Sequence, residues 1–239
     1  MENKIRHYEH ESISDINGIL LVDKPDGMTS HDVVSFIKKT FKFKKVGHGG
    51  TLDPFATGLL VVMLNKATKI SQDISGADKV YTADVVFGIK TDTQDPTGRI
   101  IQERKCSLDK EHLTKVLNKF TGIIEQLPPM YSAVKHKGKK LYQYARKGID
   151  IKRTPRQIEI KELTLKTLNK NQAGFFIKCS KGTYIRQLFS DIGDEMGCGA
   201  HVHALRRICS GAYDIDKAIS FDRLNSLTNK DIYESIQRI

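Results

Sequence analysis

Hydrophobic residues in this chain follow two different periods, and segments of the two kinds intermingle along the sequence. Residues 80–87 alternate between apolar and polar side chains, which is the two-residue period of a half-buried strand. Residues 113–120 carry apolar side chains three and four positions apart, which predicts a helix with Asp109 as its cap and Gly122 as its end. Strands and helices do not alternate strictly, so the pattern favours a mixed α/β domain on one twisted sheet.

Other segments extend this pattern over most of the chain. An apolar run is followed by Pro25-Asp26-Gly27, which predicts a buried strand that ends in a tight turn. The hydroxyl of Ser30 is expected to cap a helix that runs to about Phe41. The buried strand before the turn covers 18–24. Further strands are predicted at 157–168, 174–180 and 202–213, and further helices at 185–196 and 220–239.

The size and composition of the chain suit a folded protein. It has 239 residues, of which 39% are hydrophobic, and no glycine- or proline-rich linker divides it. We therefore expect a single domain over 1–239. The polar start MENKIRHYEHESISD does not resemble a secretory signal, and no apolar run reaches membrane-spanning length. Four cysteines in so long a chain favour reduced thiols and a cytoplasmic location.

Positive charge is concentrated in one part of the sequence. Lysine and arginine outnumber aspartate and glutamate by 39 to 28, a net charge of +11 that attracts polyanions. Periodicity fails between Leu127 and Arg156, and tyrosines there lie among basic residues. This stretch of about 128–156 is interpreted either as an insertion that clamps RNA or as a solvated loop. Its basic side chains are Lys135, Lys137, Lys139, Lys140, Arg146, Lys147, Lys152, Arg153 and Arg156.

The segment VGHGGTLDPFATGLLVV at 46–62 contains four glycines, one histidine and one aspartate. Glycines at this density let the backbone approach a ligand closely. Asp53 precedes a proline and is expected to project from a loop between ordered elements. Local chemistry allows two interpretations, a structural turn or a catalytic carboxylate. The segment lacks the Lys-Ser/Thr pair of a phosphate-binding loop, and no GxGxxG follows a strand.

A run of potential metal ligands occurs near the C-terminal end, at Cys198, His201, His203 and Cys209. Its spacing does not match the common zinc patterns. Strand alternation would place the two histidines on one face and leave Cys209 buried. We therefore expect no metal site, although a Cys/His metalloprotein remains an alternative.

Seven segments of the chain, in the same order, resemble the TruB family of tRNA pseudouridine synthases. The resemblance extends from Gly18 to about Tyr213, and so many ordered blocks make it highly specific. The blocks are GILLVDKPDGMTSHDVV, GHGGTLDPFATGLL, DKVYTADVVFG, KTDTQDPTG, PPMYSAVKHKGKKLYQYARKGI, CSKGTYIRQL and GCGAHVHALRRICSG.

The resemblance implies a pseudouridine synthase fold, with one large twisted mixed sheet flanked by helices and loops. It also implies that Asp53 is the catalytic aspartate. The reaction breaks the N1–C1′ bond of uridine 55 in the T-loop of tRNA and rejoins the uracil through C5. Such an isomerisation requires a carboxylate and a closed pocket for a base flipped out of its stack, and no cofactor. Whether Asp53 attacks C1′ or C6 stays open.

The same resemblance assigns roles to other residues. Arg186 would pair with the catalytic carboxylate, and Tyr81 would stack on the target base, with a plain core tyrosine as the alternative. His48 would contact the RNA loop, and Tyr184 and Leu205 would line the uracil pocket. Further expected RNA contacts are Lys24, Lys79, Lys135, Lys137, Lys139, Lys140 and Arg146.

Family members often carry a C-terminal PUA domain, whereas only about 26 residues follow Tyr213 here. We therefore expect no PUA domain and a weaker affinity for tRNA. The expected partner is the T-stem-loop of tRNA, and we expect a monomer without metal or membrane association. A protein that only binds RNA, as an RNA chaperone, is the main alternative to an enzyme.

Overall fold

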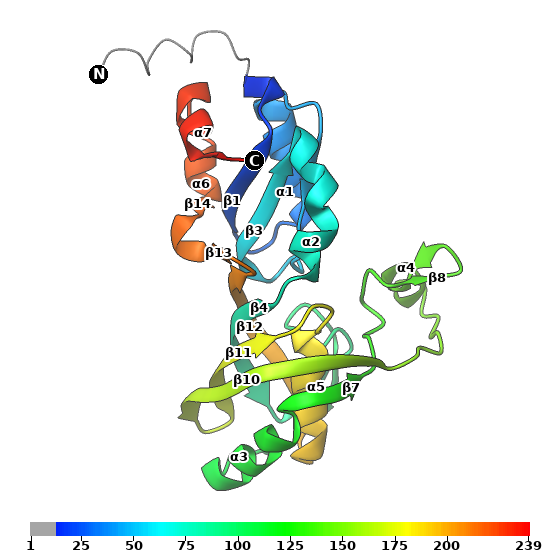
Figure 1. The fold of residues 1–239 in the computed structure, drawn as a ribbon. Helices are drawn as coiled ribbons and strands as arrows, with labels where there is room; N and C mark the ends of the chain where they lie inside the picture. The colour runs from blue at the N-terminus through cyan, green and yellow to red at the C-terminus, as the bar shows by residue number, and fades with distance from the viewer. Residues whose placement is uncertain (1–12) are drawn as a thin grey trace. The chain divides into compact units, whose positions relative to one another are not determined.

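The computed structural model describes residues 13–239, so most of the polar start, which does not resemble a secretory signal, lies outside the described residues. These residues form a mixed α/β structure with a large mixed sheet flanked by helices (Figure 1). The chain divides into two compact units. Unit 1 contains residues up to Ala77 together with Arg206–Ile239, and unit 2 contains Asp78–Leu205.

The sheet of unit 1 is built on two central strands, β1 (Gly18–Lys24) and β3 (Thr57–Leu64), which pair antiparallel. The short strand β2 (Val46–His48) pairs with β3. Strands β14 (Ile219–Ser220) and β15 (Gln237–Arg238) pair with β1. The helical elements of this unit are η1 (Ile13–Asp15), α1 (Ser30–Thr40), η2 (Asn65–Ile70), α2 (Ser71–Gly76), η3 (Ile215–Lys217), α6 (Phe221–Leu224) and α7 (Asn229–Ser235).

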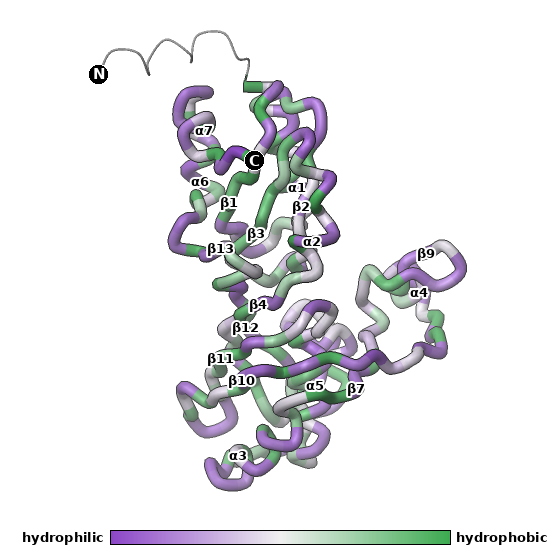
Figure 2. Tube along the Cα trace, viewed as in Figure 1, coloured by the Kyte–Doolittle hydropathy of each residue, from purple (hydrophilic) through white to green (hydrophobic). Residues whose placement is uncertain are grey.

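Both faces of β1 and β3 are buried, which explains why these strands read as continuous apolar runs. One face packs against Val33 and Ile37 of α1 and against Leu224 and Ile232 near the C-terminus. The other face packs against η2 and α2. Figure 2 shows these two strands mainly in the hydrophobic colour. The buried strand predicted at 18–24 is therefore confirmed.

The cap of α1 differs from the prediction. The N-cap is Thr29, whose side chain accepts the N–H of Asp32, while the Asp32 carboxylate accepts the N–H of Thr29. This reciprocal capping box satisfies two backbone donors at the helix start. Ser30 is the first helical residue, and its hydroxyl is used elsewhere. The assignment of Ser30 as the cap was wrong because Thr29 offers an equivalent hydroxyl one residue earlier.

Unit 2 holds an antiparallel sheet in the order β4-β11-β10-β7, and β12 (Ala200–Ser210) lies beside β4 (Lys79–Phe87). Strand β12 runs on into unit 1, where Arg206 and Arg207 pair with the start of β3. A two-residue strand β13 (Tyr213–Asp214) pairs with its end. The remaining long strands are β10 (Arg156–Asn169) and β11 (Gln172–Cys179), which confirms the predictions for these regions.

Two helices accompany this sheet. Helix α5 (Ile185–Glu195) buries its apolar stripe, and Phe189 packs on Phe175 of β11 with ring centroids 4.6 Å apart. Helix α3 (Lys110–Lys119) begins at Asp109, whose carboxylate accepts the N–H of His112, as predicted. The helix ends before Gly122, which instead opens strand β7 (Gly122–Gln126) with a positive φ. The sequence pattern did not reveal β7.

The basic insertion leaves the sheet of unit 2 after β7 and returns at β10 (Figure 1). It is not wholly irregular, since it contains a hairpin of β8 (Lys135–His136) and β9 (Lys139–Lys140), followed by the short helix α4 (Leu141–Ala145). Lys137 and Gly138 form the hairpin turn with positive φ. A second small hairpin in unit 2 joins β5 (Ile89–Thr91) and β6 (Ile100–Glu103).

Candidate active site

Asp53 lies in unit 1, in the connection between β2 and β3, and is half-buried. Its carbonyl oxygen accepts the N–H of Ala56 at 3.1 Å, which closes a four-residue turn with Pro54 at the second position. Proline suits that position because its fixed φ matches the turn geometry. The carboxylate therefore projects from a short, closed turn at the start of a buried strand.

The hydroxyl of Ser30 holds the residue before Asp53 in place. It accepts the N–H of Leu52 at 2.8 Å and donates to the carbonyl of Leu52 at 3.2 Å. Ser30 is only 2% exposed, so these bonds are shielded from water. Both polar groups of the Leu52 backbone are thus satisfied by one side chain from α1.

Lys24 supports the same turn from β1. Its side chain is fully buried, and the ammonium donates to the carbonyls of Pro25, Met28 and Pro54 at 2.7, 2.7 and 3.1 Å. Burial lowers the pKa of Lys24 to about 8, although the nearby carboxylates of Asp26 and Asp53 raise it. Lys24 was expected to contact RNA. Its ammonium instead joins the turn after β1 to the turn that carries Asp53.

Arg207 lies on β12, and its side chain binds the backbone of the glycine-rich segment. It is 1% exposed, and it donates to the carbonyl of Leu59 through Nε at 2.8 Å and to that of Gly50 through Nη2 at 3.1 Å. A side chain at Gly58 would place its Cβ 2.3 Å from the carbonyl oxygen of Arg207, so only glycine fits there. The sequence pattern gave no sign of this role, although Arg207 lies within the motif GCGAHVHALRRICSG.

His48 ends β2 and pairs with Val62 of β3. The next residue, Gly49, donates its N–H to Val61 at 2.9 Å. A Cβ at Gly49 would lie 2.1 Å from Cγ2 of Ile74, which explains why glycine follows the histidine. His48 and Asp53 therefore belong to one braced loop of unit 1.

Arg186 lies at the start of α5 in unit 2 and is 3% exposed. Its guanidinium donates to the carbonyl of Thr93 at 2.6 Å and to that of Tyr131 at 2.9 Å. Its Nε lies 3.8 Å from Oδ2 of Asp95. The side chain is thus fixed by the loop between β5 and β6 and by the start of the insertion. Asp53 belongs to unit 1, and the pairing of Arg186 with Asp53 stays a prediction.

Asp95 lies in the segment TDTQDPTG, where the sequence pattern indicated only a loop. Its buried carboxylate accepts hydrogen bonds from both Thr93 Oγ1 and Thr97 Oγ1, at 2.7 and 2.6 Å, and from the N–H of Thr97 at 3.0 Å. This local network shapes the loop that holds Arg186. The two threonines two positions on either side of Asp95 were the available signal.

Tyr184 forms the N-cap position of α5. The side chain of Gln126 accepts the N–H of Tyr184 at 2.8 Å and donates to its carbonyl at 3.1 Å. Gln126 is 2% exposed and comes from β7, a strand that the sequence pattern did not predict. The backbone of Tyr184 is therefore fixed from the neighbouring strand.

The other predicted pocket residues lie on two adjacent strands of unit 2. Tyr81 and Lys79 are on β4 and Leu205 is on β12, and all three are buried. Tyr81 shares the apolar face of its strand with Ala83 and Val85, as the alternation predicted. Both interpretations of Tyr81, base platform and core residue, agree with this position.

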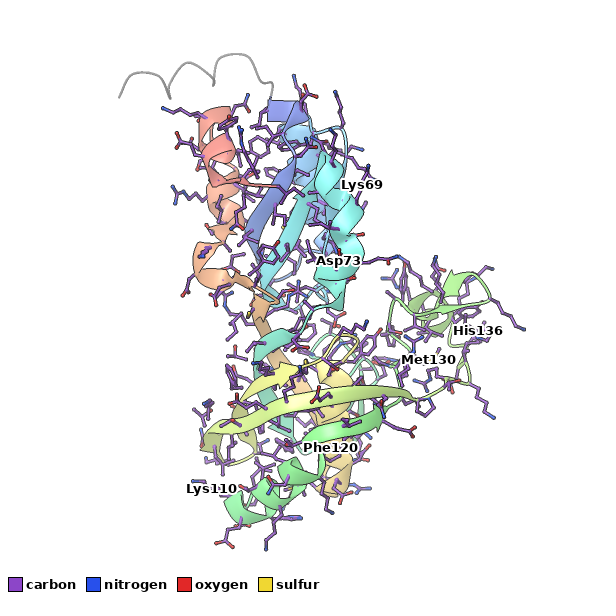
Figure 3. All side chains as sticks on the ribbon, in the orientation of Figure 1. Lys69, Asp73, Lys110, Phe120, Met130 and His136 are labelled. Atoms are coloured by element: carbon purple, nitrogen blue, oxygen red, sulfur yellow. The ribbon has the colours of Figure 1, made fainter. Side chains whose placement is uncertain are left out.

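Most basic side chains of the insertion are exposed. Lys135, Lys137, Lys139, Lys140 and Arg146 all point to solvent. Lys140 and Arg146 lie over the ring of Tyr142, at 5.7 and 5.3 Å from its centroid. Figure 3 labels Met130 and His136, which mark the beginning of the insertion and its hairpin.

Unit 1 has a basic depression of about 390 Å³ that was not predicted from the sequence. Its lysines come from the connection after α1 and from η2, and Lys69 is labelled in Figure 3. The clustered lysines of KKTFKFKK at 38–45 were the available signal. The lining residues are Asp15, Asn17, Lys44, Lys45, Asn65, Lys66, Thr68 and Lys69.

Across residues 13–239, no group of three or more His, Cys, Asp or Glu side chains is arranged to hold a metal ion. His201 and His203 lie near each other on β12, with ring centroids 6.4 Å apart. Cys209 was expected to be buried but is half-buried, and its thiol donates to the carbonyl of Gly211. No helix in the same range is both long and apolar enough to cross a membrane.

Known structures share this fold. The chain resembles a chain in the crystal structure of a Cbf5-Nop10-Gar1 complex with a TM-score of 0.73 and 29% identity, covering 95% of the present chain and 61% of that one. It also resembles a chain of an H/ACA RNP bound to a substrate RNA containing 2′-deoxyuridine, with a TM-score of 0.68 and 28% identity. That match covers 92% of the present chain and 56% of the other. The present chain thus spans less than two thirds of either.

Sequence relatives define the class of enzyme. Residues 38–185 match the N-terminal domain of the TruB family pseudouridylate synthases, and residues 186–238 match the C-terminal domain of tRNA pseudouridylate synthase B. The fold and these matches make the chain a pseudouridine synthase, an isomerase that acts on RNA.

More particularly, the chain belongs to the TruB family. It is 45% identical to the tRNA pseudouridine synthase B of Salmonella typhimurium over 213 residues, which cover 89% of this chain and 68% of that one. It is 44% identical to the protein of the same name from Escherichia coli O1:K1, over 90% of this chain and 69% of the relative. The resemblance noted in the ordered blocks is confirmed.

Proposed function

We propose that this chain converts uridine 55 in the T-loop of tRNAs to pseudouridine, with Asp53 as the catalytic carboxylate. The observation that carries the proposal is the braced turn around Asp53. Side chains of Ser30, Lys24 and Arg207, from three different elements, hold the backbone on both sides of this residue. Fixing a reactive group before the substrate arrives is how an enzyme avoids reorganisation during the reaction.

The chemistry needs no outside reactant. The N1–C1′ bond of the uridine breaks, the uracil turns within the site, and a C5–C1′ bond forms, so the product has the same atoms as the substrate. A carboxylate can attack or stabilise the electron-poor carbon during this exchange. We propose that Arg186 pairs with this carboxylate and that Tyr81 stacks on the flipped base, while Tyr184 and Leu205 line the uracil pocket.

RNA binding is supported by the distribution of charge. The exposed lysines of the insertion and the lysines around the basic depression offer contacts to phosphates. The names of the curated relatives, tRNA pseudouridine synthase B, support tRNA as the substrate. We propose that the T-stem-loop is the part of the tRNA that enters the site, and that the target base is bound there after it has flipped out of its stack.

The test compares wild type and Asp53→Asn on a T-stem-loop transcript. We expect wild type to form pseudouridine at a single uridine and the variant to form none while it still binds the RNA. Asp26→Asn is the control, because Asp26 is an exposed carboxylate in the neighbouring turn and should leave the rate unchanged. Product formation by Asp53→Asn at the wild-type rate would refute the assignment. Binding without product formation by wild type would favour an RNA chaperone instead.

A further inference from the structure

Two cysteine thiols that are far apart in the sequence lie almost in bonding contact. The Sγ atoms of Cys106 and Cys198 are 2.9 Å apart, although 92 positions separate the residues. The S–S bond of a disulfide is about 2.05 Å long, so the two atoms need to approach by only about 1 Å. Both residues belong to unit 2, and neither contributes to the catalytic site described above.

Neighbouring hydrogen bonds keep the two segments together. Cys106 follows β6, and Cys198 lies between α5 and β12. Gln102 donates from its side chain to the carbonyl of Cys198 at 3.2 Å, and Arg104 donates to that of Gly197 at 3.0 Å. These hydrogen bonds hold the two segments close together independently of the contact between the sulfur atoms.

Glycines make the close approach of these segments possible. Gly88 donates its N–H to the carbonyl of Gly199 at 2.8 Å and accepts the N–H of Arg104 at 2.7 Å. A Cβ at Gly88 would lie 3.1 Å from Cβ of Cys106 and 2.5 Å from the carbonyl oxygen of Arg104. A larger residue at 88 would push the Cys106 segment away. The backbone thus fits closely around the thiol pair.

We propose that Cys106 and Cys198 are a modification site, at which an oxidant of the peroxide class forms a reversible intramolecular disulfide. Cys106 is half-buried and is the partner that a small oxidant reaches first, because Cys198 is only 7% exposed. The disulfide would join the β5–β6 hairpin to the segment after α5. The loop of this hairpin holds Arg186 through Thr93, so the crosslink would stiffen the support of that residue.

The oxidation consumes two thiols and one molecule of peroxide. The Cys106 thiol loses its proton and attacks the peroxide, so the O–O bond breaks, Cys106 becomes a sulfenic acid and one water is released. The Cys198 sulfur then attacks Sγ of Cys106, the S–O bond breaks and a second water leaves with the proton of Cys198. Two thiols are oxidised to one disulfide, and hydrogen peroxide is reduced to two waters. A dithiol reductant reverses the result.

The environment of Cys106 slows its reaction with an oxidant. Burial, followed by the hydrogen bond with Cys198, raises the pKa of the Cys106 thiol to about 12. The thiolate is the reactive form, so little of it exists near neutral pH. The reaction with peroxide is therefore slow, and the short distance to Cys198 favours the disulfide over further oxidation of the sulfenic acid.

The test treats the full reduced chain with hydrogen peroxide at low protein concentration and then alkylates the remaining thiols under denaturing conditions. We expect the loss of two alkylatable thiols and a peptide that links Cys106 to Cys198 and separates on reduction. The disulfide would close a loop between residues 92 positions apart, and this crosslink should raise the midpoint of thermal unfolding by about 10 °C. Cys106→Ser and Cys198→Ser should each abolish the linked peptide and the shift.

Cys209→Ser is the matched control, because it removes another half-buried thiol and should leave the linked peptide intact. The peptide map of the wild type decides the question even if a cysteine variant folds poorly. The proposal is overturned if Cys106 and Cys198 both remain alkylatable, if Cys106 ends as a sulfinic acid, or if the disulfide joins other cysteines. The result is independent of pseudouridine formation, which is measured separately.

Discussion

Nε of Arg186 lies 3.8 Å from Oδ2 of Asp95, and the two side chains are only 4% and 8% exposed. The same guanidinium donates to the carbonyl of Thr93, two residues before Asp95. The carboxylate in turn shapes this loop by accepting bonds from Thr93 and Thr97. Asp95 therefore supplies a nearby negative charge to Arg186 and shapes the backbone of a loop that holds it.

Asp95→Asn should lower the rate of pseudouridine formation by at least about tenfold, because a small displacement of a positioned group is costly. It should also destabilise unit 2 by about 3 kcal/mol, since a buried cation loses its nearby charge. Single-turnover kinetics and chemical denaturation measure the two effects. Arg99→Gln is the control in the same hairpin, because Arg99 is 89% exposed and its ion pair contributes little. Equal activity of Asp95→Asn and wild type would exclude this positioning role.

Lys24→Met should destabilise the protein by about 3 kcal/mol, because three carbonyl groups around a buried site lose their donor. We expect the turn of Asp53 to loosen and activity to fall with it. Urea denaturation gives the stability. Lys44→Met is a suitable control, since the Lys44 side chain is 75% exposed. If the two variants are equally stable, the ammonium does not hold the turns together.

The lowered pKa of Lys24 predicts that the stability of the protein depends on pH. Burial lowers the pKa of Lys24 from 10.5 to about 8, so between these values the unfolded chain binds more protons than the folded one. The contribution of Lys24 to the free energy of unfolding should therefore rise as the pH increases from 8 to 10.5. The difference between wild type and Lys24→Met, measured across this range, isolates the contribution. A difference that is constant or falls with pH contradicts the lowered pKa.

Ser30→Ala should cost about 1–3 kcal/mol, because the N–H and carbonyl of Leu52 would both lose their buried partner. The residue next to Leu52 is Asp53, so kcat should fall more than RNA binding does. Ser226→Ala removes an exposed hydroxyl that donates to Arg223 and should have little effect. Unchanged kcat in a folded Ser30→Ala variant would show that Asp53 does not need this support.

Gly49→Ala should destabilise unit 1 by about 1–3 kcal/mol through overpacking, because the new Cβ would meet Cγ2 of Ile74 at 2.1 Å. A second change, Ile74→Ala, removes that atom and should restore part of the loss. The double-mutant cycle measures this coupling by denaturation. Gly76→Ala is the control, since a Cβ there meets nothing within 4 Å. Purely additive effects of the two changes would rule out the clash.

Much of the secondary structure could be predicted from local pattern. The strands β1, β4, β10 and β11 and the helices α3 and α5 follow from hydrophobic period and capping residues, which act within a few positions of the chain. Strand β7 was missed because Ile123 and Glu125 are exposed while the strand is held by pairing with β10. The hairpin and helix inside the basic insertion were missed because they are too short to show a period.

The sequence by itself determined the family, the elements of the sheet and the identity of Asp53 as the candidate carboxylate, because ordered motifs and periods are local properties of the chain. Only the tertiary structure decided what supports that residue. Lys24, expected to contact RNA, is buried under the turn, and Asp95 lies beside the buried guanidinium of Arg186. The Cys106–Cys198 contact joins residues 92 positions apart. Such relationships arise when distant segments pack together, and no local pattern encodes which of them will meet.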